Sequence, residues 1–274
     1  MNLSELNIFP VKSLGGISLK SSIVEERGLQ FDRRWLLVDD KNHFLTQREL
    51  PQMARFAIEL GNEGLDITFE GNNVTVSFQS NTEETANVKI WSSRVKAKFY
   101  ADEVSDWFSE NLQTKCRLVS MTEESKRIIA PFYAVRKFKD TVSFADAYPF
   151  LLIGESSLED LNGKLENSLS MNRFRPNFVI SGSEAFAEDS WKKIKIGDTV
   201  FHVVKSCARC VITTIDQEKG AKNGAEPLAT LAKYRKKNGN VLFGRYLIAE
   251  KPGEIIKIGD AVEILETVKS TRAS

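Results

Sequence analysis

The chain has 274 residues, 42% of them hydrophobic and 27% charged, a composition typical of a globular protein with one large domain or two modest ones. Its net charge of +1 gives no global field that would attract nucleic acid or an anionic membrane. No basic segment precedes an early apolar run, and no stretch approaches ~18 unbroken apolar residues, so the sequence predicts neither a signal peptide nor a membrane span. Three cysteines do not suggest a disulfide framework, and we expect a cytoplasmic protein.

The first hundred residues are rich in strand signals. The predicted strands are residues 17–24, 34–38, 43–46, 66–70, 74–78 and 95–100. Short polar segments at 39–42 and 71–73 join four of these strands into two hairpins. We therefore expect a small β-rich, barrel-like unit. A helix follows, because the apolar residues Val104, Trp107, Phe108 and Leu112 recur at steps of three and four.

Strands and helices alternate in the second half, after a stretch without a clean period at 121–140. That stretch mixes basic and aromatic side chains, and in a nearly neutral protein this favours a solvated linker over a nucleic-acid site. A capping-box pattern from Ser156 to Glu159 predicts one helix, and Pro227 opens another. The predicted strands are residues 177–181, 201–205 and 211–215. The sequence Lys-Ile-Gly-Asp occurs at 195–198 and at 257–260, which indicates turns at two corners of a barrel.

Cys207 and Cys210 lie in the most informative segment, residues 206–214. A thioredoxin-like site needs such a pair at the start of a helix, whereas the β-branched residues after Cys210 predict a strand. A structural zinc site needs four ligands, and the sequence offers no second pair at ligand spacing. The remaining candidate ligands are Cys116, His43 and His202.

Two interpretations of the cysteine segment stay open on these grounds. Free cysteines are usually buried, so both thiols could be structural. Alternatively, one of them is a thiolate ligand of a redox metal, with Arg209 favouring the thiolate of Cys210 beside it.

The cysteine segment stands in an ordered series of motifs that covers nearly all of the chain. In the second half these are Asn-Arg-Phe-Arg-Pro-Asn at 172–177, Glu-Asp-Ser-Trp at 188–191, Phe-Gly-Arg-Tyr at 243–246 and Pro-Gly-Glu-Ile at 252–255. Their order resembles the MOSC family, named for the C-terminal domain of molybdenum cofactor sulfurase. In the first half, residues 9–14, 32–35 and 46–48 resemble the β-barrel domain that precedes MOSC in many members. The whole resembles bacterial relatives of the mitochondrial amidoxime-reducing component.

The resemblance implies a mixed α/β, β-rich fold, with an N-terminal β-barrel-like domain and a MOSC β-barrel domain with flanking helices. We expect the N-terminal MOSC-associated domain at 1–115, a linker at 116–140, the MOSC domain at 141–268 and a flexible tail at 269–274.

The resemblance also implies a molybdopterin-type cofactor held between the two domains, with one cysteine on its metal. The matching cysteine is Cys210, the predicted metal ligand. The predicted cofactor-binding residues are Lys12, Ser13, Arg33, Arg175 and Arg209. Guanidinium groups suit this role because they form paired hydrogen bonds to phosphate. The predicted catalytic residues are Cys210, Asp146 and Asn177. Without the motifs, Lys12 and Arg33 would be read as surface charges, and Asp146 as a helix or turn cap.

The implied activity is two-electron reduction of small N-hydroxylated compounds, namely hydroxylamines, amidoximes or N-hydroxylated bases. Asp146 would supply or relay a proton, and Asn177 would orient the substrate. Two alternative functions belong to other classes of protein. One is a molybdenum-cofactor or sulfur carrier with a persulfide on Cys210, and the other is a non-catalytic module that binds another phosphate ligand.

Electrons are expected to come from a separate flavin or iron–sulfur protein. The sequence shows no iron–sulfur spacing and no glycine-rich dinucleotide motif. We also expect neither the membrane anchor of the mitochondrial relatives nor the C-terminal ferredoxin-like domain of some bacterial ones. Arg136, Lys137 and Lys139 form a candidate docking surface for an acidic redox partner, although a solvated linker is the simpler interpretation. No nucleic-acid or membrane partner is expected.

Overall fold

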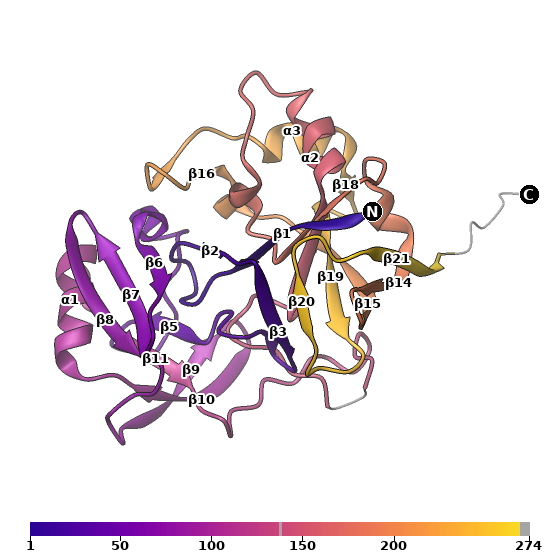
Figure 1. The fold of residues 1–274 in the computed structure, drawn as a ribbon. Helices are drawn as coiled ribbons and strands as arrows, with labels where there is room; N and C mark the ends of the chain where they lie inside the picture. The colour runs from indigo at the N-terminus through magenta and orange to yellow at the C-terminus, as the bar shows by residue number, and fades with distance from the viewer. Residues whose placement is uncertain (137–138, 269–274) are drawn as a thin grey trace, which may run out of the picture.

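The largest sheet closes on itself to form a barrel in this computed structural model, which describes residues 1–136 and 139–268 (Figure 1). The order of its strands is β2 (Ile17–Ser18), β1 (Asn2–Ile8), β13 (Phe178–Ser181), β12 (Phe150–Gly154), β19 (Asn240–Ala249), β15 (Thr199–Ala208), β14 (Trp191–Ile196) and β21 (Val262–Thr267), with β18 (Lys236–Lys237) on β19. An antiparallel bridge between Asn2 and Ala261 joins β1 to the start of β21, and the Leu3 N–H donates to Asp260 O at 2.9 Å. These bonds close the barrel.

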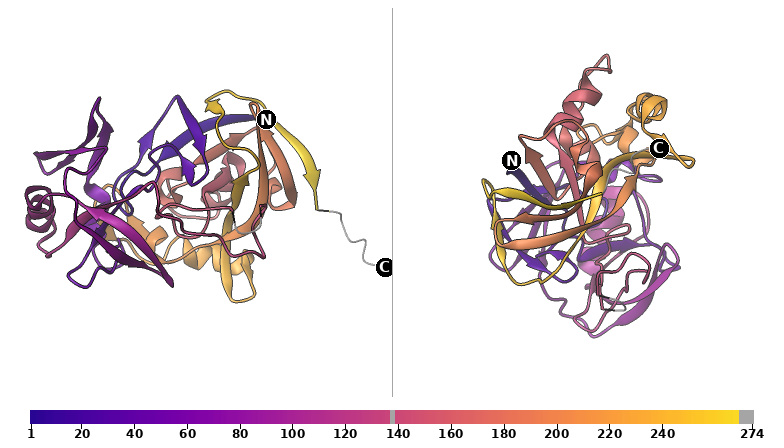
Figure 2. Two further views of the ribbon diagram at one scale, coloured as in Figure 1. Left: turned by 90° about the horizontal axis from the view of Figure 1, so that it is seen from below. Right: turned by 90° about the vertical axis from the view of Figure 1, so that its right-hand side faces the viewer.

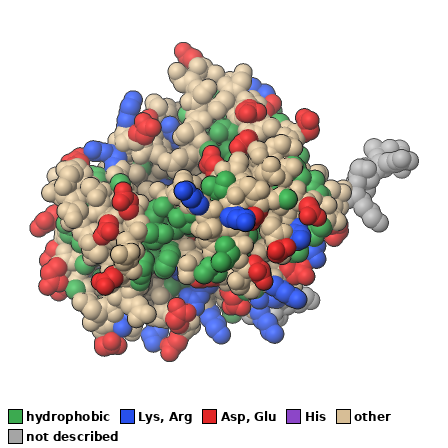
Figure 3. Space-filling view, viewed as in Figure 1, with side chains coloured by type: hydrophobic (Ala, Val, Ile, Leu, Met, Phe, Trp, Pro, Cys, Tyr) green, Lys and Arg blue, Asp and Glu red, His purple; other side chains and the backbone are tan. Residues whose placement is uncertain are grey.

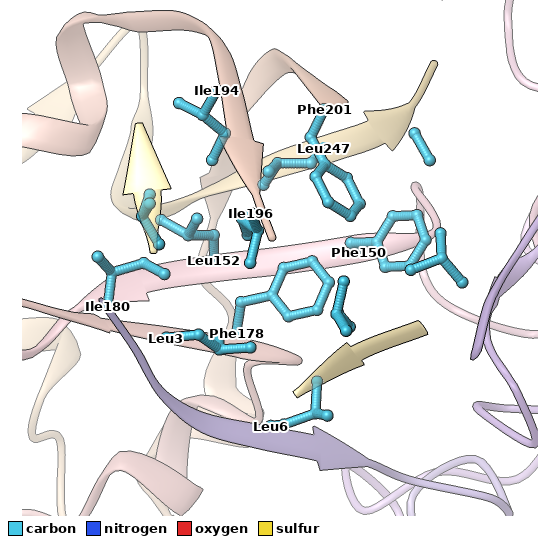
Figure 4. Packing of buried hydrophobic residues seen from close by; sticks show 14 of the residues in the cluster. Leu3, Leu6, Phe150, Leu152, Phe178, Ile180, Ile194, Ile196, Phe201 and Leu247 are labelled. Carbon is cyan, nitrogen blue, oxygen red and sulfur yellow. The ribbon is translucent and has the colours of Figure 1, made fainter. Parts of the chain in front are cut away.

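Large apolar side chains fill the barrel (Figure 4). Side chains alternate along a strand, so every second residue points inward. The ring centroids of Phe150 and Phe178 lie 5.4 Å apart, and Phe201 lies 5.3 Å from each of them. Leu3 and Leu6 of β1 pack in the same cluster. The first strand of the chain is therefore part of the barrel core.

Phe178→Ala should lower the free energy of unfolding by about 3–5 kcal/mol, because it leaves a cavity among buried rings. Denaturant titration of the purified protein measures this. Phe132→Ala is the matched control, since the side chain of Phe132 is 88% exposed and its removal should change stability by no more than about 0.5 kcal/mol. Similar losses in the two variants would contradict the assignment of the core.

A smaller β unit packs beside the barrel, as Figure 2 shows from below. One of its sheets has the order β5 (Trp35–Val38), β11 (Arg117–Met121), β10 (Ser93–Phe99) and β9 (Thr85–Ile90), and the other has β6 (Ala57–Leu60), β7 (Gly64–Phe69) and β8 (Asn72–Ser77). Helix α1 (Asp102–Leu112) packs its buried Phe108 and Leu112 into the core of this unit. The predicted β-rich, two-part fold is confirmed.

Short elements connect and flank the two units. They are the sheet of β20 (Ile255–Lys257), β3 (Ser21–Glu25) and β4 (Gly28–Leu29), the pair β16 (Ile215–Asp216) and β17 (Ala221–Lys222), helices α2 (Glu155–Asn162) and α3 (Leu228–Tyr234), and 3-10 helices η1 (Pro51–Arg55), η2 (Met171–Phe174), η3 (Ala187–Ser190) and η4 (Val211–Thr214). No helix among residues 1–136 and 139–268 is both long and apolar enough to cross a membrane.

Several predicted elements differ from the observed ones. The strand predicted at 17–24 is divided between β2 and β3, because β2 pairs with β1 and β3 pairs with β20 in another sheet. The strand predicted at 43–46 is reduced to isolated bridges, one of them between Val38 and Phe44. The range predicted as a linker includes β11, which pairs with β5 and β10. The tail predicted at 269–274 lies outside the described residues.

Candidate functional site

An open pocket lies where loops of the smaller unit meet the barrel. It has an empty volume of about 830 Å³, which includes space open to solvent. All eight predicted site residues line it, namely Lys12, Ser13, Arg33, Asp146, Arg175, Asn177, Arg209 and Cys210. They come from five separate stretches of chain, at 12–13, 33, 146, 175–177 and 209–210. The fold therefore brings together residues that are far apart in sequence.

Three of the lining residues have a left-handed backbone. The φ angles are 69° at Ser13, 50° at Arg33 and 55° at Arg175. Non-glycine residues seldom adopt this conformation, which costs about 1–3 kcal/mol and persists where the surrounding structure enforces it, often at functional sites. Here backbone N–H groups hold two of the turns, from Arg33 to Phe9 O at 3.0 Å and from Arg175 to Asn172 O at 3.2 Å.

Arg33 and Arg175 approach one aromatic ring, but only one of them has a carboxylate partner. Their guanidinium carbons lie 4.3 and 4.1 Å from the centroid of Phe9. Arg33 donates to the fully buried Asp32 at 2.7 Å. The one side-chain bond of Arg175 among the described residues is a 3.5 Å contact with Gln217. Burial, together with the neighbouring Arg33, lowers the pKa of Arg175 to about 9, although the charges of Asp32 and Asp146 act in the opposite direction. At neutral pH Arg175 is a half-buried cation without an ion-pair partner among the described residues.

Lys12 and Asp146 form an ion pair at the pocket, with 2.5 Å between Nζ and Oδ1. Burial lowers the pKa of Lys12 to about 8, although Asp146 works in the opposite direction. Burial alone would raise the pKa of Asp146, but the charges of Lys12, Arg48 and Arg33 hold it well below its usual range. Asp146 is therefore an ionised carboxylate at neutral pH, beside an ammonium group that can release its proton near pH 8.

The two cysteines of the loop have different surroundings. Cys207 lies in β15, is 2% exposed and accepts a hydrogen bond from Arg209 Nη1 at 3.0 Å. Cys210 is partly exposed and accepts one from Arg48 Nη2 at 3.2 Å. The hydrogen bond of Arg209 is therefore to Cys207, and its electrostatic support of the Cys210 thiolate stays a prediction. Phe174 O accepts a hydrogen bond from Nη2 of Arg209 at 2.7 Å, and this contact turns the guanidinium toward Cys207. Arg48, not Arg209, donates the hydrogen bond to Cys210.

The strand predicted at 211–215 is also wrong. Cys210 precedes the one-turn helix η4, and threonine hydroxyls bond to carbonyl groups three residues earlier, from Thr213 to Cys210 O and from Thr214 to Val211 O. Such local bonds compete with strand pairing. The argument against a thioredoxin-like site relied on a strand directly after Cys210, so that argument fails. That interpretation conflicts instead with Cys207, which lies inside a strand and not at a helix start.

Asn177 lies in the pocket wall and is 2% exposed. Its Nδ2 donates to Asn7 O at 3.1 Å, and its Oδ1 accepts the Leu151 N–H at 3.1 Å. The side chain therefore ties β1 and β12 together at the start of β13. One of its two amide N–H groups has no partner among the described residues, so its role in orienting substrate stays a prediction.

Arg127 supports the site from outside the pocket lining, although sequence reasoning assigned its segment to a solvated linker. It is buried, and its guanidinium donates to the carbonyl groups of Ser143, Ala145 and Asp146. These bonds fix the loop that carries Asp146. The residues around it gave no periodic signal, so the sequence alone offered no way to find this contact.

Gln47, Arg48, Arg173 and Tyr246 line the pocket as well and were not predicted as site residues. These four residues lie within the motifs that carry the family resemblance. Those motifs are the sequence signal that could have identified them as site residues. Burial raises the pKa of Tyr246 well above its usual value, so its phenol keeps its proton beside Cys207.

The pocket carries a clear excess of positive charge. Its lining has six basic side chains, Lys12, Arg33, Arg48, Arg173, Arg175 and Arg209, and one carboxylate, that of Asp146. The Nε of Arg209 is buried without a hydrogen-bond partner within the described part of the chain. Buried donors and cations of this kind are normally satisfied. The lining therefore suits an anionic ligand beside an accessible cysteine sulfur.

The fold and the site together define a class of protein. Its members have a closed β-barrel and a cationic pocket around a partly exposed cysteine. Residues 1–115 match the family described as "MOSC N-terminal beta barrel domain", and residues 139–263 match the family described as "MOSC domain". The chain belongs to the MOSC family, in the group that carries this N-terminal domain.

Relatives match over nearly the whole chain. Mitochondrial amidoxime-reducing component 1 of Mus musculus is 31% identical over 96% of this chain and 82% of that protein. Mitochondrial amidoxime reducing component 2 of Rattus norvegicus is 34% identical over 95% and 82%. Molybdenum cofactor sulfurase of Oryza sativa is 34% identical over 89% of this chain but only 32% of that protein.

Proposed function

We propose that this protein is a molybdenum-cofactor-dependent reductase that removes oxygen from small N-hydroxylated compounds in a two-electron reaction. The observation that carries the proposal is the half-buried Arg175, a cation with no ion-pair partner among the described residues, in the same pocket as the accessible sulfur of Cys210. An anionic cofactor whose metal accepts one cysteine thiolate meets both requirements. The named activity of the amidoxime-reducing relatives supplies the substrate class.

The residues present fit the anionic end of such a cofactor. Arg175, Arg33 and the unpartnered Nε of Arg209 offer donors to a phosphate, with Lys12 and Ser13 beside them. Cys210 offers the sulfur. Among the described residues no three His, Cys, Asp or Glu side chains are grouped to hold a metal by themselves, so the other ligands would come from the cofactor. When bound, this group would supply the redox metal that takes up the oxygen and receives the electrons.

The protein's own part in the chemistry is to bind, orient and deliver protons. Conversion of an N–OH group to N–H and water consumes two electrons and two protons. Lys12, with a pKa of about 8, is a suitable proton donor at neutral pH, and the ionised Asp146 would hold its ammonium group at the pocket. Asn177 would direct its remaining N–H to the substrate oxygen.

The first test is turnover with a chemical reductant. Purified protein should reduce an amidoxime or a hydroxylamine with reduced viologen dye, and should be inactive with NADH or NADPH alone, because the sequence shows no dinucleotide motif. Absence of viologen-driven turnover by molybdenum-loaded protein would overturn the proposed activity. Sustained turnover on a nicotinamide cofactor alone would overturn the need for a donor protein.

The proposed docking surface for the donor needs revision at one residue. Arg136 bonds to Asp140 at 2.8 Å and approaches Glu26 at 3.5 Å, so its charge is compensated. Lys139 is exposed, and Lys137 lies outside the described residues. Figure 3 shows basic side chains gathered along the lower edge of one face, mixed with acidic ones. We propose that Lys139 is the part of this surface available to an acidic redox protein.

Cofactor retention should weaken as the pH rises above about 8. Lys12 must be protonated to bind an anion, and its pKa in the cofactor-free protein is about 8, so above that pH binding requires the uptake of a proton. The dissociation constant should rise by up to about tenfold per pH unit. In Lys12→Met this slope should disappear below about pH 9, the pKa of Arg175, and only the slope due to Arg175 should remain above it. Release of the cofactor on dilution, measured between pH 7 and pH 9, checks this prediction, and equal slopes in both proteins would contradict it.

A further inference from the structure

Arg48 contacts the sulfur that the proposed function places on the metal. Its Nη2 lies 3.2 Å from Cys210 Sγ, and both residues line the pocket. The Arg48 backbone N–H donates to Thr46 Oγ1 at 3.1 Å, which fixes the turn after β5 from which the side chain starts. A guanidinium on a thiolate is a charge-assisted hydrogen bond, among the stronger kinds in proteins.

Trp91 holds the guanidinium of Arg48 in this position. The Arg48 guanidinium carbon lies 4.7 Å from the Trp91 ring centroid, within cation–π range. Trp91 Nε1 donates to Asp146 Oδ1 at 3.3 Å, and Phe44 packs edge-on at 5.0 Å. The hydrogen bond to Asp146 and the contact with Phe44 therefore fix the indole, which packs against the guanidinium of Arg48.

Trp91 occupies an unfavourable place for a tryptophan. It lies at the turn between β9 and β10 with a φ of 53°, and it is 41% exposed. A left-handed backbone under a bulky residue is strained. The contacts with Arg48 and Asp146 give a reason for a large aromatic residue at this turn.

We propose that Arg48 raises the reduction potential of a metal bound through Cys210, and that Trp91 is a positioning residue that keeps Arg48 on the sulfur. This inference rests on the proposed function. An N–H bond to a ligating sulfur withdraws electron density, and a positive charge nearby favours the more electron-rich, reduced state of the metal. The two effects act in the same direction.

The test compares five variants with the wild-type protein in their molybdenum-loaded form. They are Arg48→Ala, Arg48→Lys, Trp91→Ala, Trp91→Phe and the control Arg94→Ala. Arg94 is an exposed arginine on the same β9–β10 hairpin and does not line the pocket. Molybdenum content is measured first. The midpoint potential is then read from the electron paramagnetic resonance signal of the half-reduced metal, which reports only on loaded molecules, so partial loading does not hide a shift.

The midpoint potential should move to more negative values in Arg48→Ala, less in Arg48→Lys because the charge remains, and not at all in Arg94→Ala. Trp91→Ala should shift it in the same direction by a smaller amount, and Trp91→Phe should keep most of the wild-type value. Loaded Arg48→Ala with an unchanged potential would overturn this inference and leave the proposed function intact. An unchanged Trp91→Ala beside a shifted Arg48→Ala would remove the role of Trp91. A wild-type protein that takes up no molybdenum would overturn both.

Discussion

Cys210→Ala should abolish N-reductive activity and the retention of molybdenum, whereas Cys207→Ala should keep most of both. Cys210 is the accessible sulfur of the pair, at the N-terminal side of η4 and facing the cationic pocket. Cys207 is 2% exposed, lies inside β15 and already accepts a bond from Arg209. Cys207 also lines the pocket, but a metal on its sulfur would have to displace the hydrogen bond from Arg209.

The comparison needs variants that fold equally well. Cys116→Ala is a suitable third variant, because Cys116 is buried in the core of the smaller unit and burial raises the pKa of its thiol to about 11, so it should not affect the metal. Thermal unfolding of the cofactor-free proteins establishes that the folds match. Equal losses of activity and metal in well-folded Cys207→Ala and Cys210→Ala would refute the assignment.

Arg175→Ala should weaken cofactor binding by about 1.5–3 kcal/mol, the range of a hydrogen bond to a charged group, or about tenfold to 150-fold in the dissociation constant. The cofactor-free variant should be no less stable than the wild-type protein. Arg175 is a half-buried cation without an ion-pair partner among the described residues, and its partial burial costs free energy until an anion binds. Weaker binding without a loss of stability distinguishes a binding role from a structural one.

Cofactor binding is measured by release of the cofactor on dilution. Stability is measured by denaturant unfolding of the cofactor-free protein. Arg94→Ala, an exposed arginine outside the pocket, provides the control and should leave both unchanged. Wild-type retention of the cofactor by Arg175→Ala would contradict its role. A loss of stability as large as the loss of binding would show that Arg175 mainly supports the fold.

Much of the fold was predictable from the sequence because its signals are local. The hairpin of β7 and β8, the helix α1 and the strand β13 follow from alternation, helical spacing and turn residues. The place of β1 in the barrel was not predictable from local patterns, since Asn2 of β1 pairs with Ser181 of β13, which lies 179 positions later. Pairing over such a distance leaves no local pattern in the chain.

The candidate site shows the same division. Its eight residues came from motif order, and the structure brings all of them to one pocket, although their roles remain proposals. Which arginine meets which sulfur could not be deduced. Arg209 is adjacent to Cys210 in sequence but bonds to Cys207, while Arg48, 162 positions away, reaches Cys210. Side-chain direction decides this, and it depends on the packed fold.

The most direct test of the central claim is the molybdenum and pterin content of wild-type protein purified from a host that makes the cofactor. The proposed function predicts molybdenum and pterin in stoichiometric amount with the chain, and their absence from Cys210→Ala. Wild-type protein without either, and with a persulfide on Cys210, would contradict the reductase proposal and support a sulfur carrier instead.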